Sequence, residues 1–191
     1  MSKQLNKKQL THQRILAAAS ENFRSHGYAG IGVDGIAKTA DVTSGAFYSH
    51  FGSKQKAFLS AIEAGLNEVI DGVSAFQQNH NEKWVEAFAE YYLGQKHRDD
   101  LACGCAMTSL SPEVVRSDSK IKLVYETKME KIIEIMANGL TGDSEEERQN
   151  KSWTILGLLI GGLTITRAVD NQNKANAIAD SVKAAVISIS D

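Results

Sequence analysis

Few side chains in this 191-residue sequence have the types and spacing that catalysis needs. The five histidines are scattered, and no H-E-x-x-H or other paired-ligand spacing joins them. Ser109 and Ser111 lack the G-x-S-x-G context of a nucleophilic serine. Asp99-Asp100 is typical of a solvated charge pair in a turn rather than of a metal site. The sequence therefore predicts a protein that is not an enzyme and that holds no cofactor or metal.

The two cysteines form a C-x-C pair, Cys103-Gly104-Cys105, for which three hypotheses compete. Buried structural thiols rank first, because free cysteines are often buried. A redox or electrophile sensor ranks second, and His97 and Arg98 would lower a thiol pKa if they face it. A metal site ranks third, because two cysteines without a partner histidine make an incomplete ligand shell. A disulfide within the pair would be strained, so oxidation should link subunits or stop at a sulfenic acid.

The segment from Val33 to Lys54 contains two short helical patterns a few residues apart. The first runs from Val33 to Ala40, and the second begins at Thr43, a good N-cap residue. Between them lies Asp41, one of the few residue types other than glycine that tolerates the positive φ of a tight turn. Such a pair is a helix-turn-helix, whose second helix can enter a DNA major groove. We therefore expect double-stranded DNA as a partner.

The charge distribution supports this expectation. Residues 1–56 hold eight Lys or Arg against three Asp or Glu, a net charge of +5, whereas the remainder has a net charge of −7. Phosphate contacts dominate DNA affinity, so the basic end is where DNA should bind. The longest apolar run, Ile155 to Leu163, is too short to span a bilayer, and the N-terminus lacks the apolar stretch of a signal peptide. We expect a cytoplasmic protein that has no contact with a membrane.

Composition and periodicity predict an all-α fold of about nine helices, because the chain has one proline and few alternating β-branched runs. A three-helix DNA-binding domain is expected over 1–56, and a larger helical domain over 57–191. The expected helices span residues 8–26, 33–40, 43–51, 54–78, 81–96, 101–110, 118–138, 144–169 and 173–189. Ser111-Pro112-Glu113 predicts a helix restart with proline at the first helical position.

The N-terminal quarter resembles the tetracycline-repressor-like (TetR/AcrR) family of bacterial transcription regulators. The resemblance rests on the order and spacing of Arg14 to Ala19, Phe23, Gly27-Tyr28, Val33, Ile36-Ala37, Ala40, Val42, Gly45 to Tyr48, His50-Phe51 and Ser53-Lys54. It implies that the third helix is the recognition helix, while Phe47 and Phe51 are assigned to the core. The DNA-binding residues expected from the basic charges and from the resemblance are Lys8, Lys38, Thr43, Ser44, Gly45, Ala46, Tyr48, His50 and Lys54.

Two positions depart from the pattern of that family. Gly32 stands where many relatives have Thr or Ser, which caps the second helix and contacts phosphate. Asp41 stands where many have glycine, and its negative charge would weaken DNA binding if it faces phosphate. These departures keep open an alternative from another class, a helical interaction module or an enzyme that has lost DNA binding.

The resemblance also implies a two-fold dimer and an effector pocket in the larger domain. Small and apolar residues of the last two helices would form the dimer interface: Gly157, Leu158, Gly161, Ile165, Ala175, Ile178, Val182 and Val186. Aromatic, aliphatic and methionine side chains are candidates to line the pocket: Phe58, Ile62, Phe76, Trp84, Phe88, Tyr91, Met107, Tyr125, Met129 and Trp153. Each of them could instead belong to the core. Such a lining favours a small hydrophobic or aromatic effector.

The sequence thus predicts a DNA-binding transcriptional regulator, a repressor by family default, that an effector releases from a pseudo-palindromic operator. The alternative is the same scaffold acting as a thiol-based sensor through Cys103 or Cys105. Residues 104–115 resemble a segment of relatives that sense oxidants or electrophiles through the cysteine matching Cys105. The effector, the operator and the regulated genes do not follow from the sequence.

Overall fold

The computed structural model describes residues 6–102 and 104–190, and within them the regular secondary structure is helical throughout. The described helices are α1 (Lys7–Gly30), α2 (Val33–Thr39), α3 (Ser44–Phe51), α4 (Lys54–His80), the 3₁₀ turn η1 (Asn81–Lys83), α5 (Trp84–Tyr92), α6 (Gln95–Asp99), α7 (Ala106–Val115), α8 (Ser119–Asn138), α9 (Glu145–Ala168) and α10 (Gln172–Ser190). The expected all-α class is confirmed. None of the helices in the described part of the chain is long and apolar enough to cross a membrane.

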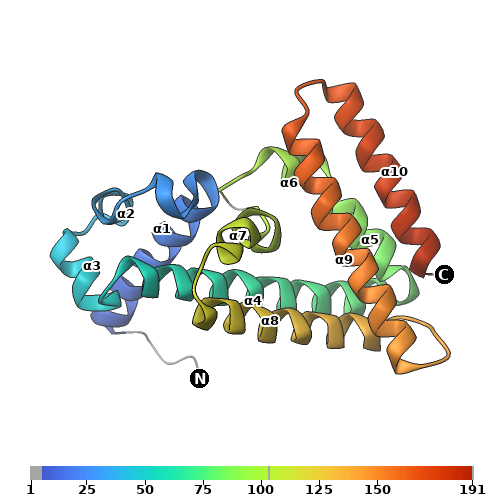
Figure 1. Cartoon of the computed structure of the whole chain (residues 1–191), viewed down its shortest axis with the longest axis horizontal. Helices are drawn as coiled ribbons and strands as arrows, with labels where there is room; N and C mark the ends of the chain where they lie inside the picture. Colours follow the sequence, from blue (N-terminus) through green and yellow to red (C-terminus); the bar gives the residue numbers. More distant parts are fainter. Residues whose placement is uncertain (1–5, 103, 191) are drawn as a thin grey trace.

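Helix α4 is the axis of the molecule (Figure 1). Its first turns pack against α1 and α3, which with α2 form a small head at one end, its later turns pack against α5 and α7, and α8 runs beside it from Gln55 to Gln77. The antiparallel pair α9 and α10 stands at the opposite end (Figure 1). Because α4 runs unbroken from Lys54 to His80, it crosses the domain boundary expected between residues 56 and 57. A movement of this helix would therefore displace parts of both the head and the larger domain.

Side-chain caps fix where most of the long helices begin. Thr43 accepts a hydrogen bond from the Ala46 N–H, and Ser53, Asp118 and Ser144 cap α4, α8 and α9 in the same way. Each cap satisfies one of the backbone N–H groups that a helix N-terminus leaves unpaired. The sequence signals at these positions therefore placed the helix starts within a residue.

Gly27 behaves differently from the expected helix terminator. It has a φ of +71°, as a C′ glycine would, but the chain turns back into helical conformation and α1 continues to Gly30. The extra turn is held by Tyr28, whose ring lies 5.0 Å from that of Phe58 and 5.9 Å from that of Phe23. Burial of this aromatic cluster outweighs the tendency of glycine to end the helix.

The region between α5 and α8 differs most from the sequence-based expectation. The charged turn expected at residues 97–100 contains the short helix α6, and the helix expected over 101–110 begins only at Ala106. Pro112 lies inside α7 and not at a helix start. The apolar face of Met107, Leu110 and Val114 continues through the proline at helical spacing and is buried. That burial outweighs the one hydrogen bond that proline removes near the end of the helix.

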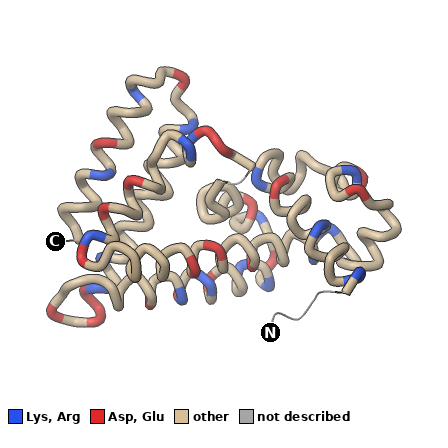
Figure 2. Tube along the Cα trace, turned by 180° about the vertical axis from the view of Figure 1, so that it is seen from behind, with Lys and Arg blue, Asp and Glu red and all other residues tan. Residues whose placement is uncertain are grey.

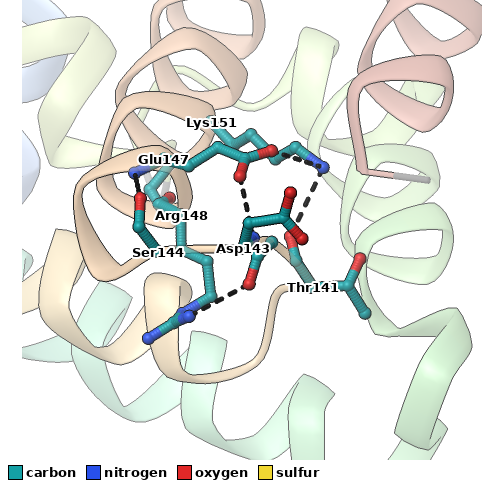
Figure 3. A network of polar contacts seen from close by, with 8 residues as sticks. Thr141, Asp143, Ser144, Glu147, Arg148 and Lys151 are labelled. Atoms are coloured by element: carbon teal, nitrogen blue, oxygen red, sulfur yellow. Dashed lines mark hydrogen bonds and ion pairs between the residues drawn. The ribbon is translucent and has the colours of Figure 1, made fainter.

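Charge is distributed unevenly along the long axis. Figure 2 shows lysines and arginines on the head at one end and acidic residues in the turn between α8 and α9 at the other. This acidic turn is internally bonded (Figure 3). The Glu147 carboxylate accepts the Asp143 N–H at 2.8 Å, while Arg148 and Lys151 donate to the Gly142 and Thr141 carbonyls at 3.3 Å each. These bonds fix the conformation of the turn, and no group of three potential metal ligands occurs in the described ranges.

Candidate functional site

The head presents a helix-turn-helix formed by α2 and α3. The turn between them is made by Asp41, whose φ of +51° is the positive value that the sequence predicts there. The inner face of α3 is anchored by Phe47 and Phe51, which are buried against Ile36 and the rest of the core, as expected for two core aromatics. Because the inner face is fixed in this way, the opposite face of α3 is held rigidly toward solvent.

The outer face of α3 carries several of the predicted DNA-binding residues. Tyr48 is 52% exposed, and Gly45 and Thr43 are also exposed. The Thr43 hydroxyl caps the helix, and the Ser44 hydroxyl donates to the Asp34 carboxylate at 2.5 Å. The bond from Ser44 to Asp34 joins α3 to α2, so the Ser44 hydroxyl already has a partner within the protein. No local pattern predicts this bond, because its partners are ten residues apart.

Basic residues border this face on three other helices. Lys8 of α1 and His50 of α3 line the same surface depression, with His12 between them. The rings of His12 and His50 lie 5.7 Å apart. Lys38 is exposed near the end of α2, and the Lys54 ammonium lies 4.5 Å above the ring of Tyr28 at the start of α4. The predicted basic positions therefore surround the helix-turn-helix and do not form one cluster.

The start of α2 lacks a side-chain cap. Gly32 is its N-cap and supplies no side-chain hydrogen bond, so the first backbone N–H groups of the helix face solvent without a capping side chain. Such groups attract anions. A partly buried bond that sequence reasoning missed joins the end of this helix to α1: Asn22 donates to the Thr39 hydroxyl at 3.0 Å.

A cavity of about 150 Å³ lies inside the larger domain. Its walls come from α4, α5, α6 and the start of α7, and the residues that line it are Gly65, Glu68, Val69, Gly72, Phe76, Phe88, Tyr91, Tyr92, His97, Gly104, Cys105 and Ala106. The α4 members recur every three or four residues and so share one face of that helix. Gly72 is the signal that could have located the cavity, since a Cβ there would meet nothing within 4 Å.

The predicted pocket residues separate into three groups. Phe76, Phe88 and Tyr91 line this cavity. Tyr125, Met129 and Trp153 instead line a surface groove of about 510 Å³ between α8 and α9. The remaining four, Phe58, Ile62, Trp84 and Met107, are buried in the core and line neither space.

Cys105 lies on the cavity wall within a polar network. The Tyr92 hydroxyl bonds to the Thr108 hydroxyl at 2.9 Å, and the thiol forms a hydrogen bond with the same tyrosine. Burial raises the pKa of the Cys105 thiol, and burial also raises the pKa of Tyr92. The thiol is therefore protonated near neutral pH, where it is a weak nucleophile.

His97 and Arg98 do not activate this thiol. His97 accepts a hydrogen bond from the Cys105 backbone N–H at its Nε2, 3.0 Å away, and burial lowers the pKa of the imidazole. The ring is thus neutral and faces the backbone. Arg98 donates to Gln95 and Asn176 instead. Cys103 lies outside the described residues.

The segment that closes one side of the cavity is fastened to α9 by one side chain. The Arg167 guanidinium donates to the backbone carbonyls of His97 at 2.7 Å, Asp100 at 3.1 Å and Arg98 at 3.2 Å. A Cβ at Gly104 would lie 2.5 Å from Arg167 Nη2, so only glycine allows this approach. The cavity wall and the C-terminal helix pair are therefore mechanically linked.

The residues predicted for the dimer interface also divide between two environments. Gly157, Gly161 and Ile165 follow one another along the outer face of α9, where Ile165 is 53% exposed and a Cβ at either glycine would meet nothing within 4 Å. Leu158, Ile178 and Val182 are half-buried, and Ala175 and Val186 are buried. The second group packs within the protomer: Gly162 of α9, for example, contacts Val182 of α10.

Comparison with known proteins gives a family match to the head. Residues 15–61 match the model of bacterial regulatory proteins of the tetR family. The HTH-type transcriptional repressor NemR of Escherichia coli strain K12 is 23% identical over 150 residues, which cover 77% of this chain and 73% of the relative. Its similarity therefore extends beyond the helix-turn-helix into the larger domain.

Solved structures share the fold of the whole chain. A TetR-family transcriptional regulator from Cytophaga hutchinsonii superimposes with a TM-score of 0.79 at 18% identity, over 98% of each chain. The transcriptional regulator FadR from Bacillus subtilis, in complex with stearoyl-CoA, has a TM-score of 0.71 at 17% identity, over 92% of this chain and 97% of that one.

Proposed function

Because the chain belongs to the tetR family of bacterial regulatory proteins and is a DNA-binding transcriptional regulator, we propose that it acts as a homodimeric repressor released by a small effector. The observation that carries the proposal is the rigid helix-turn-helix, whose recognition face is solvent-exposed at the end of the molecule opposite α9 and α10 (Figure 1). The effector cavity lies between these two ends.

DNA contact would use α3 in the major groove. Gly45 and Ala46 allow close approach to base edges, and Tyr48 reaches furthest from the exposed face. Lys8, Lys38 and Lys54, which lie on the helices around α3, would contact phosphates, together with the open N-terminus of α2 at Gly32. Few of these groups read bases specifically, so one head alone would discriminate poorly between sequences.

A dimer would supply the missing specificity. The exposed apolar face of α9, with Gly157, Gly161 and Ile165, would pack against the same face of a second copy and present two heads to one DNA duplex. The operator would then be pseudo-palindromic, with half-sites about one helical turn or more apart.

The effector would bind in the cavity of about 150 Å³. Four aromatic residues, Phe76, Phe88, Tyr91 and Tyr92, line it, and α4 joins it directly to the head. The NemR similarity, which spans both domains, supports a repressor. The FadR complex supports a ligand bound within this fold, although a molecule as large as stearoyl-CoA needs far more space than this cavity provides.

Thiol sensing is the second candidate, and the position of Cys105 on the cavity wall is the observation in its favour. The raised pKa of that thiol, which burial causes, argues against a fast reaction with oxidants. A Cys105→Ser variant that still leaves DNA normally under oxidant would exclude this candidate.

The proposal is tested by a gel shift of the protein on the DNA upstream of its own gene, with unrelated DNA of equal length as competitor. A specific complex whose affinity falls steeply with salt supports it, because each neutralised phosphate contributes about −0.9 to the slope of log K against log salt. An affinity that is equal for both DNAs, or flat with salt, would refute it.

A further inference from the structure

A buried arginine of the head lies against Gly65, one of the residues that line the cavity. Arg24 of α1 has a side chain that is only 6% exposed, and its Nη2 donates to Glu68 Oε2 at 2.9 Å. Its Nε is buried and has no hydrogen-bond partner among the described residues. A buried guanidinium is best satisfied by two parallel bonds to one carboxylate. In this structure Glu68 supplies a single oxygen.

A missing side chain gives the guanidinium access to the cavity wall. A Cβ at Gly65 would lie 2.8 Å from Arg24 Nη2 and 2.5 Å from the Ala106 Cβ. Gly65, Glu68 and Ala106 all line the cavity, so Arg24 lies against its wall where α4 meets the start of α7. Burial raises the pKa of Cys105, and the Arg24 charge opposes that effect, which places the charge within electrostatic reach of the thiol.

Another part of the cavity wall is aromatic. The ring of Phe76 lies 5.4 Å from that of Phe88 and 5.5 Å from that of Tyr91. An engineered apolar cavity of about 150 Å³ in another protein binds benzene. The cavity described here has a similar volume, about 150 Å³, and so suits a molecule with one ring.

The Glu68 carboxylate, the present partner of Arg24, can separate from it. The Glu68 side chain is 66% exposed, so its carboxylate can turn into water with little loss of solvation. Arg24 has no such route, because moving an unpaired guanidinium within the protein interior is costly. An anion in the cavity would therefore exchange with Glu68 while Arg24 stays in place.

We propose that the cavity binds a one-ring aromatic carboxylate whose carboxylate group replaces Glu68 as the partner of Arg24. The proposal rests on the cavity being the effector site and adds the chemical class of the effector. It also gives the signal a route. Arg24 belongs to α1 and Glu68 to α4, so the exchange removes an ion pair that joins the head to the connecting helix. Arg24 lies one turn before the Gly27 kink, where α1 changes direction.

The test is calorimetric titration of the full-length protein with benzoate and with benzamide, its uncharged counterpart. Wild-type protein should bind benzoate more tightly than benzamide. Glu68→Gln removes the competing carboxylate from an exposed position and should tighten benzoate binding several-fold. Arg24→Gln should weaken it by about tenfold to a hundredfold, the usual effect of losing hydrogen bonds to a charged group. Asp71→Asn makes the same charge change on α4 at an exposed residue outside the cavity, and should change nothing.

Three results would overturn the proposal: no benzoate binding at millimolar concentration, equal affinity for benzoate and benzamide, or equal benzoate affinity in the Glu68→Gln and Asp71→Asn variants. The comparison of these two variants stands even if Arg24→Gln fails to fold. DNA binding is measured on the same preparations. Specific DNA binding together with any of these results refutes only the ligand class, whereas loss of specific DNA binding by the wild-type protein refutes the proposed function itself.

Discussion

Filling the cavity from Gly72 should produce a protein that is more stable but does not respond to its effector. Gly72 lines the cavity on α4, and a Cβ there would meet nothing within 4 Å. The Cβ that Gly72→Leu adds therefore clashes with no neighbouring atom. It should gain about 1 kcal/mol of helix propensity and up to about 2 kcal/mol from apolar burial. For a chain of this length, that corresponds to a rise in Tm of roughly 5 to 10 °C.

The same leucine would occupy most of the space that a ligand needs. A cavity of about 150 Å³ is the size left by truncating one buried leucine. If a ligand and this leucine occupy the cavity together, overpacking costs about 1–3 kcal/mol of binding free energy, which weakens the affinity roughly tenfold to a hundredfold. The assay is a thermal-shift screen of small aromatic compounds, followed by titration of each compound that stabilises the wild-type protein.

Two matched variants separate blocking from general effects of the substitution. Gly72→Ala gains helix propensity but leaves most of the cavity open, and should keep its response. Ala75→Leu places the same bulk on an exposed position of α4 outside the cavity. If Gly72→Leu folds and still binds every wild-type ligand at full affinity, the cavity is not the effector site.

Three further predictions concern the turn, the dimer face and the thiol. Asp41→Asn keeps a residue that tolerates the φ of +51° but removes a negative charge beside the DNA, so operator affinity in a gel shift should rise about two- to fivefold, and a fall would contradict the placement. Gly161→Arg puts a charge on the exposed face of α9 and should convert a dimer to a monomer in analytical ultracentrifugation, whereas an unchanged dimer would show that another surface associates. Because burial raises the pKa of Cys105, its alkylation by iodoacetamide should be slow at pH 7 and should still be increasing with pH past the ordinary thiol pKa; a plateau near neutral pH would show an activated thiolate.

Local signals predicted the helices well wherever a cap or a special backbone angle fixes the chain. Thr43, Ser53 and Asp118 begin helices because each satisfies a backbone N–H within its own turn. Asp41 adopts a positive φ because its residue type tolerates it. These effects depend on a few neighbouring residues, so they can be predicted from the sequence.

The site was harder to predict because it depends on contacts between distant segments. Pro112 predicted a helix start, and that prediction was wrong because the burial of Leu110 and Val114 on either side of it keeps α7 continuous. Aromatic residues pointed to a pocket in general, but the cavity lies where Gly72 provides no side chain. The Arg24–Glu68 pair spans 44 residues, and no periodicity in the sequence predicts it.

The measurement that tests the account most directly is DNA affinity in the presence of a ligand that occupies the cavity. Fluorescence anisotropy on the upstream DNA would compare the wild-type protein with Gly72→Leu, each with and without a ligand from the screen. The account predicts that the ligand weakens DNA binding of the wild-type protein at least tenfold and leaves that of Gly72→Leu unchanged. Equal weakening of both proteins, or no specific DNA binding by either, would contradict it.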